Sequence, residues 1–218
     1  MNYHKKTIKL ISMPYSVPGE TEVARFEEKY KLQLPLSVRE WFSEIDGQSI
    51  LSEYSNCDDA LHPKSFRVEY FDDKELLVFM HENQCVCWWA VELGEEHDPT
   101  VWVNIDLPSS NWQVCSYKFS EFVYTRVFDF AHWKDGLLLI ETKTPVTNED
   151  ISELESNYCV EPRSYGWPSS TAFRFSNGDK RITIWSGSDQ ADWVLSASSL
   201  AELRELREKV EPIMRDFA

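Results

Sequence analysis

The residues of this chain best suited to chemistry lie in one short segment. Cys85 and Cys87 are separated by a single residue, and His81 lies four residues before Cys85. These residue types suit a metal or thiol site, but a structural zinc has four ligands and usually two or more residues between paired cysteines. We therefore interpret Cys85 and Cys87 as buried thiols on one face of a strand, because free cysteine is among the most buried residue types. The sequence predicts no metal site.

Known catalytic patterns are absent from the chain. It contains neither phosphate-binding glycine motif, no G-x-S-x-G nucleophile motif and no H-E-x-x-H zinc pair, and its five histidines are dispersed. Carboxylate pairs are frequent, but in so acidic a chain they arise by chance. An unfamiliar active site around 165–167 or 186–189 is an alternative, although these residues are more typical of turns. We predict no catalytic residues, no cofactor and no enzymatic activity.

The distribution of charge is the strongest compositional signal. The chain of 218 residues has 22 basic and 37 acidic side chains, for a net charge of -15. Residues 51–110 hold 3 basic and 13 acidic side chains, a net charge of -10. Such a surface repels nucleic acid and attracts cationic partners. Composition alone does not distinguish a solvated acidic face from a docking surface.

The first half of the chain combines helices with a run of short strands. Periodic apolar residues predict helices over Glu20 to Lys31 and Lys118 to Trp133. Between them, Ser37 and Glu40 suggest a capping box at the start of a helix that ends at Asp46-Gly47. The predicted strands are an edge strand at Thr7 to Ile11 and a meander formed by Phe66 to Phe71, Leu76 to Met80, Cys85 to Val91 and Val101 to Ile105.

The last third has the pattern of a second unit. A strand at Leu137 to Thr142 precedes a helix whose start is marked by Thr147 and Asp150. A final helix is capped by Ser199 and Glu202. The strands in between are predicted at Thr171 to Phe175, Arg181 to Trp185 and Trp193 to Ser196, with Asn177-Gly178 as the turn of a hairpin.

These elements predict an α+β protein with two parts, residues 1–135 and residues 136–218, which could also pack as one unit. No apolar run approaches the ~18 residues of a membrane helix, and no signal peptide is recognised at the N-terminus. We therefore expect a cytoplasmic protein with reduced thiols and no membrane partner.

Four landmarks within residues 20–133 resemble the SUKH superfamily, which includes the fungal Smi/Knr cell-wall regulators and many bacterial immunity proteins. The first is Leu34-Pro35 with the helix Ser37 to Phe42 and Gly47 after it. The others are Glu82-Asn83-Gln84 entering the Trp88-Trp89 strand, Asp98-Pro99-Thr100-Val101 entering the next strand, and Trp112 followed by Phe119-Ser120-Glu121-Phe122. Two departures are Cys85, where glycine is usual, and Asp46-Gly47-Gln48, which replaces a glycine-rich pair.

The resemblance implies a SUKH-like antiparallel or mixed sheet flanked by helices, without a catalytic centre, and leaves residues 136–218 as a C-terminal α+β extension. It also implies an immunity protein that neutralises a toxin, often a nuclease. A nuclease needs a basic surface, which an acidic protein can cover. The predicted contact residues are the loop carboxylates of Glu53, Asp58, Asp59, Asp72, Asp73, Glu95, Glu96 and Asp98.

Two functional hypotheses follow. In the first, the chain is a cytoplasmic immunity protein that binds a cognate cationic toxin through its acidic surface. In the second, it is a regulatory interaction module of the Smi/Knr type with housekeeping partners. The sequence determines neither the identity of the toxin nor the oligomeric state.

Overall fold

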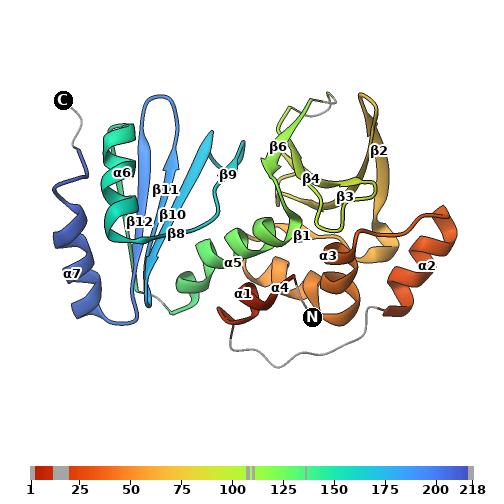
Figure 1. Cartoon of the computed structure of the whole chain (residues 1–218), viewed down its shortest axis with the longest axis horizontal. Helices are drawn as coiled ribbons and strands as arrows, with labels where there is room; N and C mark the ends of the chain where they lie inside the picture. Colours follow the sequence, from red (N-terminus) through yellow and green to blue (C-terminus); the bar gives the residue numbers. More distant parts are fainter. Residues whose placement is uncertain (1–2, 12–19, 107–108, 110, 136, 216–218) are drawn as a thin grey trace. The chain divides into compact units, whose positions relative to one another are not determined.

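The computed structural model describes residues 3–11, 20–106, 109, 111–135 and 137–215 (Figure 1). The chain divides into two compact units, residues 1–130 and residues 131–218. Within the described residues there are seven α-helices and two sheets, and every strand pairing is antiparallel. The predicted α+β class is therefore confirmed, with antiparallel rather than mixed sheets.

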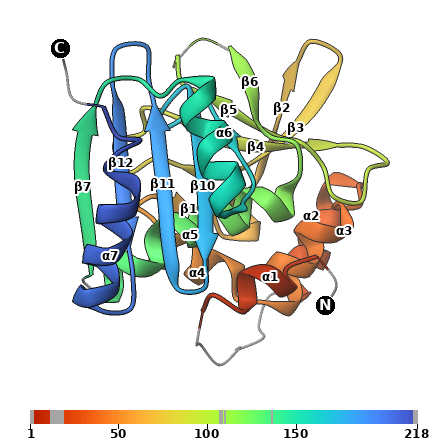
Figure 2. The ribbon, with the colours of Figure 1, turned by 60° about the vertical axis from the view of Figure 1, so that its left-hand side comes forward.

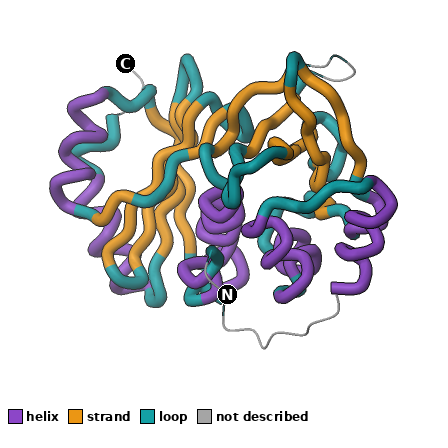
Figure 3. The backbone as a smooth tube through the Cα atoms, turned by 45° about the vertical axis from the view of Figure 1, so that its right-hand side comes forward, coloured by secondary structure: helices purple, strands orange, loops and turns teal. Residues whose placement is uncertain are grey.

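The first unit begins with short helices, continues with a curled six-stranded sheet and ends with the long helix α5 (Figure 3). The strand order is β1-β3-β4-β5-β6, and β2 pairs with β3 on the same side as β1. Its helical elements are α1 (Lys5–Ile8), α2 (Glu20–Tyr30), α3 (Leu36–Arg39), a π-helical turn (Glu40–Glu44), α4 (Gly47–Glu53), a 3-10 turn (Pro63–Ser65) and α5 (Phe119–Asp135), which continues into the second unit. Its strands are β1 (Asp59–Ala60), β2 (Arg67–Phe71), β3 (Lys74–His81), β4 (Trp88–Leu93), β5 (Val101–Asn104) and β6 (Trp112–Ser116).

Aromatic side chains form the core between α5 and the first sheet. Phe119 and Phe122 of α5 meet Phe79 of β3 edge-to-face, with ring centroids 5.4 and 5.6 Å apart. Phe122 also contacts Trp89 of β4 at 6.2 Å. Such pairs contribute about 0.5–1.5 kcal/mol each beyond their buried area. This packing fixes the sheet on the helical layer and so sets the positions of the loops between its strands.

The second unit is a six-stranded sheet with helices α6 and α7 on one face (Figure 2). The strand order is β7-β12-β11-β10-β8, and β9 also pairs with β10. Leu154 of α6 and Leu206 of α7 are fully buried against Ile182, Ile184 and Trp193 of the sheet. The elements are β7 (Leu138–Lys143), α6 (Asn148–Asn157), β8 (Cys159–Val160), β9 (Ser164–Tyr165), β10 (Thr171–Asn177), β11 (Lys180–Ser186), β12 (Ala191–Ser196) and α7 (Leu200–Val210).

The predicted helix caps of the second unit are present. The side chain of Thr147 accepts a hydrogen bond from the Asp150 N–H, and Asp150 accepts one from the Thr147 N–H in return. The side chain of Ser199 accepts from the Glu202 N–H at the start of α7. These bonds join residues only three positions apart, so the local sequence pattern was able to indicate them.

The capping box predicted at Ser37 and Glu40 is wrong. Helix α3 already begins at Leu36, after Pro35, and the buried hydroxyl of Ser37 has no hydrogen-bond partner among the described residues. The Glu40 carboxylate instead accepts a hydrogen bond from the backbone N–H of Tyr3 at 3.2 Å. A contact with the N-terminal segment therefore replaces the local cap.

The N-terminal segment is helical rather than extended. The strand predicted over 7–11 is wrong, since α1 occupies Lys5–Ile8 and a turn follows it. His4 precedes the helix and is fully buried, with its Nε2 2.8 Å from the Ser37 carbonyl oxygen and its ring 4.7 Å from that of Trp41. Packing against the helical layer thus decides the conformation of this short segment.

Three further boundaries differ from the predictions. Strand β4 begins at Trp88 rather than Cys85, because a turn occupies residues 83–86. The helix predicted to end at Asp46-Gly47 ends at Glu44, and the Asp46 side chain caps a further helix, α4, which begins at Gly47 and was not predicted. In the hairpin of the second unit Asn177 pairs with Lys180, so Gly178 and Asp179 form the turn.

None of the described helices is both long enough and apolar enough to cross a bilayer.

Candidate functional site

Four of the predicted contact residues lie at one end of the β3–β4 strand pair. Glu75 pairs with Leu93, so the β2–β3 turn and the β4–β5 loop leave these neighbouring strands at the same end. The turn carries two of the carboxylates and the loop the other two, and all four are exposed. Within the described part of the chain none of the four has an ion-pair partner. They are Asp72, Asp73, Glu95 and Glu96, and we call them the acidic end.

The cations nearest in sequence to the acidic end are already paired. Lys74 Nζ lies 2.6 Å from Glu92 Oε1, and Arg67 Nε lies 3.2 Å from Glu69 Oε1. The neighbouring Tyr70, on β2, is 71% exposed, the highest value among the large hydrophobic side chains of the described residues. Exposed tyrosines are frequent anchors of protein interfaces. Sequence reasoning missed it because an aromatic residue in a strand is usually buried.

Glu53 and Asp59 lie elsewhere in the first unit. Glu53 is exposed at the last position of α4. Asp59 is exposed on β1, opposite His81 at the far end of β3, where its Oδ2 lies 3.3 Å from His81 Nε2. The two residues can face solvent, but they do not join the acidic end on the β3–β4 pair.

The prediction that Asp58 faces a partner is wrong. Asp58 is only 4% exposed, and its carboxylate forms an ion pair with the buried Arg126 of α5. Burial raises the pKa of Asp58, while the positive charge of Arg126 lowers it in part. The chain therefore uses this carboxylate internally, to tie the segment before β1 to α5.

Asp98 is also engaged within the first unit. Its Oδ1 accepts a hydrogen bond from the Ser120 N–H at 2.9 Å, and its Oδ2 accepts one from the Ser120 hydroxyl at 2.6 Å. Ser120 is the second residue of α5, so Asp98 satisfies a backbone N–H that the helix leaves free at its N-terminus. The structure corrects the prediction, because both oxygens of this carboxylate have a partner within the fold.

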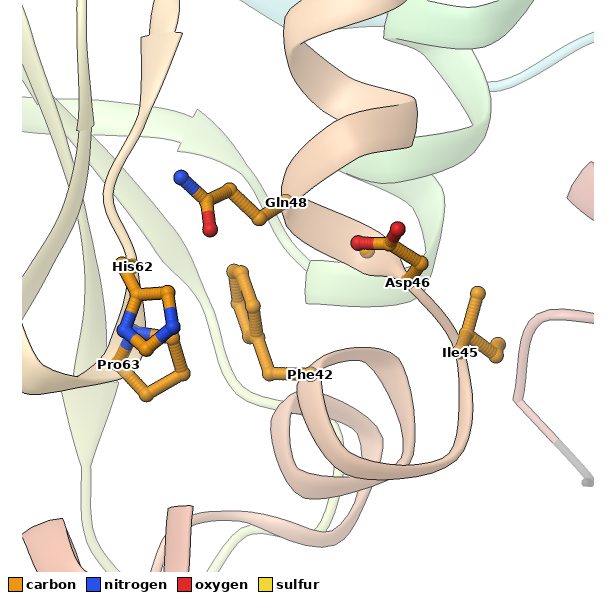
Figure 4. Close-up of a pocket in the computed structure, with 7 residues that line it drawn as sticks. Phe42, Ile45, Asp46, Gln48, His62 and Pro63 are labelled. Carbon is orange, nitrogen blue, oxygen red and sulfur yellow. The ribbon is translucent and has the colours of Figure 1, made fainter. Parts of the chain in front are cut away.

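A small pocket in the first unit has Asp46, Gln48 and His62 among its lining residues (Figure 4). It has a volume of about 70 Å³ and lies between the end of the π-helical turn and the segment that carries His62 and Pro63. Asp46 accepts a hydrogen bond from the Ser49 N–H, and His62 Nδ1 accepts one from the Lys64 N–H. The side chains of Asp46 and His62 therefore each cap a short helix.

A larger hollow of about 360 Å³ lies in the second unit, between α6, the β10–β11 hairpin and α7. Its two ammonium groups, from Lys180 and Lys209, both lie 2.6 Å from the carboxylate oxygens of Glu205. Hydrogen bonds from these two lysines lower the pKa of Glu205 to about 2. Because one carboxylate engages both cations, we assign no ligand to this hollow.

The cysteines differ from the prediction of buried thiols on one strand face. Cys87 is buried, and burial raises the pKa of its thiol far above the ordinary value. Cys85 is exposed in the turn before β4, with a φ of 59°. Among the described residues, no group of three or more His, Cys, Asp or Glu side chains could hold a metal ion.

Comparison of the chain with family models, with curated proteins and with solved structures finds no match in any of the three. Inference about function therefore rests on the residues themselves.

Proposed function

We propose that this chain is a non-catalytic immunity protein of the cytoplasm that binds and neutralises a cationic toxin domain of the nuclease type. The observation that carries the proposal is the acidic end, with four exposed carboxylates on adjacent loops that have no ion-pair partner among the residues the structure describes. The resemblance of residues 20–133 to SUKH immunity proteins supports the same function. Binding through the acidic end requires neither a catalytic residue nor a cofactor.

The physical basis of the proposed interaction is charge complementarity. A nuclease binds phosphates with lysine and arginine, so its active face is positive. Carboxylates without an internal partner attract such a face over a distance of about 8 Å at physiological salt. An individual exposed ion pair contributes only about 0.2–1 kcal/mol, so the charges act together, mainly on the rate of association. Tyr70 beside the turn offers an apolar contact once the two proteins have met.

Charge reversal at the acidic end tests the proposal. In one variant Asp72, Asp73, Glu95 and Glu96 are all replaced by Lys. The matched control makes the same change of charge at four exposed acidic residues outside the acidic end, namely Glu28, Asp179, Asp189 and Glu208. The probe is the C-terminal toxin domain encoded next to the gene, and affinity is measured by calorimetry at several salt concentrations.

We expect the wild-type chain to bind and inhibit the domain, with an affinity that falls as salt rises. The first variant should lose at least about tenfold in affinity, because slower association weakens the complex, and the control much less. Equal effects of the two variants would overturn the surface assignment. Absence of any complex at low salt, or of a toxin gene beside this one, would overturn the immunity function and favour the Smi/Knr-type regulatory module.

A further inference from the structure

Asp59, His81 and Cys85 lie in a row in the first unit, outside the acidic end. Cys85 Sγ is 3.6 Å from His81 Nδ1, within the range of a hydrogen bond to sulfur. On the other side of the same ring, Asp59 Oδ2 is 3.3 Å from His81 Nε2. The two contacts link a thiol, an imidazole and a carboxylate from the turn before β4, the end of β3 and β1.

The order of these groups determines what they can do. The imidazole lies between the thiol and the carboxylate, and its two nitrogens face opposite partners, so the three residues cannot bind one metal ion. With a proton on Nε2 toward the carboxylate, Nδ1 is the nitrogen that can take the proton of the thiol. This is the arrangement of an activated nucleophile, a base beside the thiol and a third group that orients the base.

The surroundings of Cys85 hold the thiol at the surface. Its N–H donates to the Glu82 carbonyl oxygen, and the Glu82 carboxylate accepts from the Gln84 N–H at 2.7 Å. The Glu82 carbonyl oxygen also lies 3.1 Å from His81 Nδ1, where it can accept a hydrogen bond from a protonated ring. Arg67 is a nearby cation. Burial lowers the pKa of Arg67, and the negative charge of a thiolate at Cys85 acts to raise it.

We propose that Cys85 is a nucleophilic thiol, with His81 as its base and Asp59 as the residue that positions His81, and that it is a site of modification by low-mass disulfides such as glutathione disulfide. The exposed position of Cys85 on a turn favours a small soluble reagent. This inference is independent of the proposed function.

The reaction is a thiol–disulfide exchange. The Sγ–H proton of Cys85 passes to His81 Nδ1, and the thiolate attacks one sulfur of the disulfide. A new S–S bond forms between Cys85 and that sulfur as the original S–S bond breaks. The departing thiolate takes the proton back from the imidazolium. Cys85 is thereby oxidised to a mixed disulfide, and the leaving half of the reagent is reduced to a thiol.

The chain supplies its own controls for a test. Cys57 and Cys159 are exposed as well, and neither has an imidazole within hydrogen-bonding distance in the described part of the chain. The full-length protein is incubated with glutathione disulfide near neutral pH, and adduct formation at each cysteine is followed by peptide mass spectrometry. We expect Cys85 to react at least about tenfold faster than either control thiol. Equal rates at the three cysteines would overturn the proposal.

Variants separate the roles of the two partners. His81→Gln should lower the Cys85 rate to about that of Cys57, without changing the Cys57 rate in the same sample. Asp59→Asn should lower it by a smaller factor, and Asp59→Glu should restore part of it, because a carboxylate can again face His81 Nε2. A Cys85 rate that is unchanged in His81→Gln would exclude His81 as the base. Loss of reactivity in Asp59→Glu equal to that in Asp59→Asn would exclude the positioning role of Asp59.

Discussion

Replacing Arg126 with Met removes the charge that compensates the carboxylate of Asp58. Both partners of this ion pair are buried, with 4% of Asp58 and 7% of Arg126 exposed. Methionine retains much of the apolar contact that the Arg126 side chain makes with Trp89, whose ring centroid lies 5.0 Å from the guanidinium carbon. The substitution therefore acts mainly on charge rather than on packing.

The expected loss of stability follows from this burial. Breaking a buried ion pair by removing one partner costs about 3–5 kcal/mol, because a charge remains in a poorly solvated place. Changing both partners, in Asp58→Asn with Arg126→Met, removes the stranded charge and should recover most of that loss. Asp58→Asn alone leaves Arg126 buried without its carboxylate, so it should also be destabilising.

The loss depends on pH, and its sign follows from the pKa of Asp58. Burial already raises this pKa above the value of 3.8 for a free side chain, and Arg126 opposes the rise. Without Arg126 the pKa of Asp58 in the folded state rises further. Between the folded-state pKa of Asp58 in the wild type and the higher value in Arg126→Met, Asp58 is protonated in the folded variant and ionised in the folded wild type. In this range the difference in unfolding free energy between wild type and variant grows with pH, by up to about 1.4 kcal/mol per pH unit. Above the variant's pKa it stays constant.

Urea denaturation followed by tryptophan fluorescence, from about pH 5 to about pH 8, measures this difference. The wild type and the three variants are compared at each pH. A loss in Arg126→Met below about 1 kcal/mol that does not vary with pH would refute the reasoning, because it would mean that the Asp58 carboxylate reaches solvent. Failure of the double variant to recover stability would mean that the role of Arg126 is packing rather than charge.

Three further predictions concern single positions of the first unit. Gly47→Ala should destabilise by about 1–3 kcal/mol in urea denaturation, since an added Cβ would lie 2.3 Å from the Trp41 ring. Asp72→Gly should raise the free energy of unfolding by about 0.5–1 kcal/mol, seen as a higher urea midpoint, because the φ of 50° at this turn position suits glycine. Burial lowers the pKa of His4 from 6.5, so stability should decline as pH falls below about 6.5, where the unfolded chain gains a proton first. His4→Phe should reduce this decline, and an unchanged slope would contradict the assignment.

Several features that depend on neighbouring residues were predictable from the sequence, although the cap predicted at Ser37 and Glu40 was not formed. The caps at Thr147 and Ser199 use hydrogen bonds across three residues. The alternating apolar runs located most of the central strands, because one face of each strand must be buried. Short elements such as β1 and α4 were missed, since two to seven residues carry too little pattern to be distinguished from a loop.

The candidate surface was only partly predictable. Sequence located the excess of acidic residues, including Asp72, Asp73, Glu95 and Glu96, in loops between strands. It could not distinguish Asp58 from its neighbour Asp59, one of which is buried against Arg126 and the other exposed on β1. The difference depends on a partner 68 residues away in the chain.

The sequence by itself determined the α+β class and the excess of negative charge in residues 51–110, because the order of periodic segments and the composition carry both. Tertiary structure alone decided which carboxylates remain free. Packing of α5 against the sheet brings Arg126 to Asp58 and Ser120 to Asp98, and pairing of β1 with β3 brings Asp59 to His81. Such contacts join segments distant in sequence, and no local pattern encodes them.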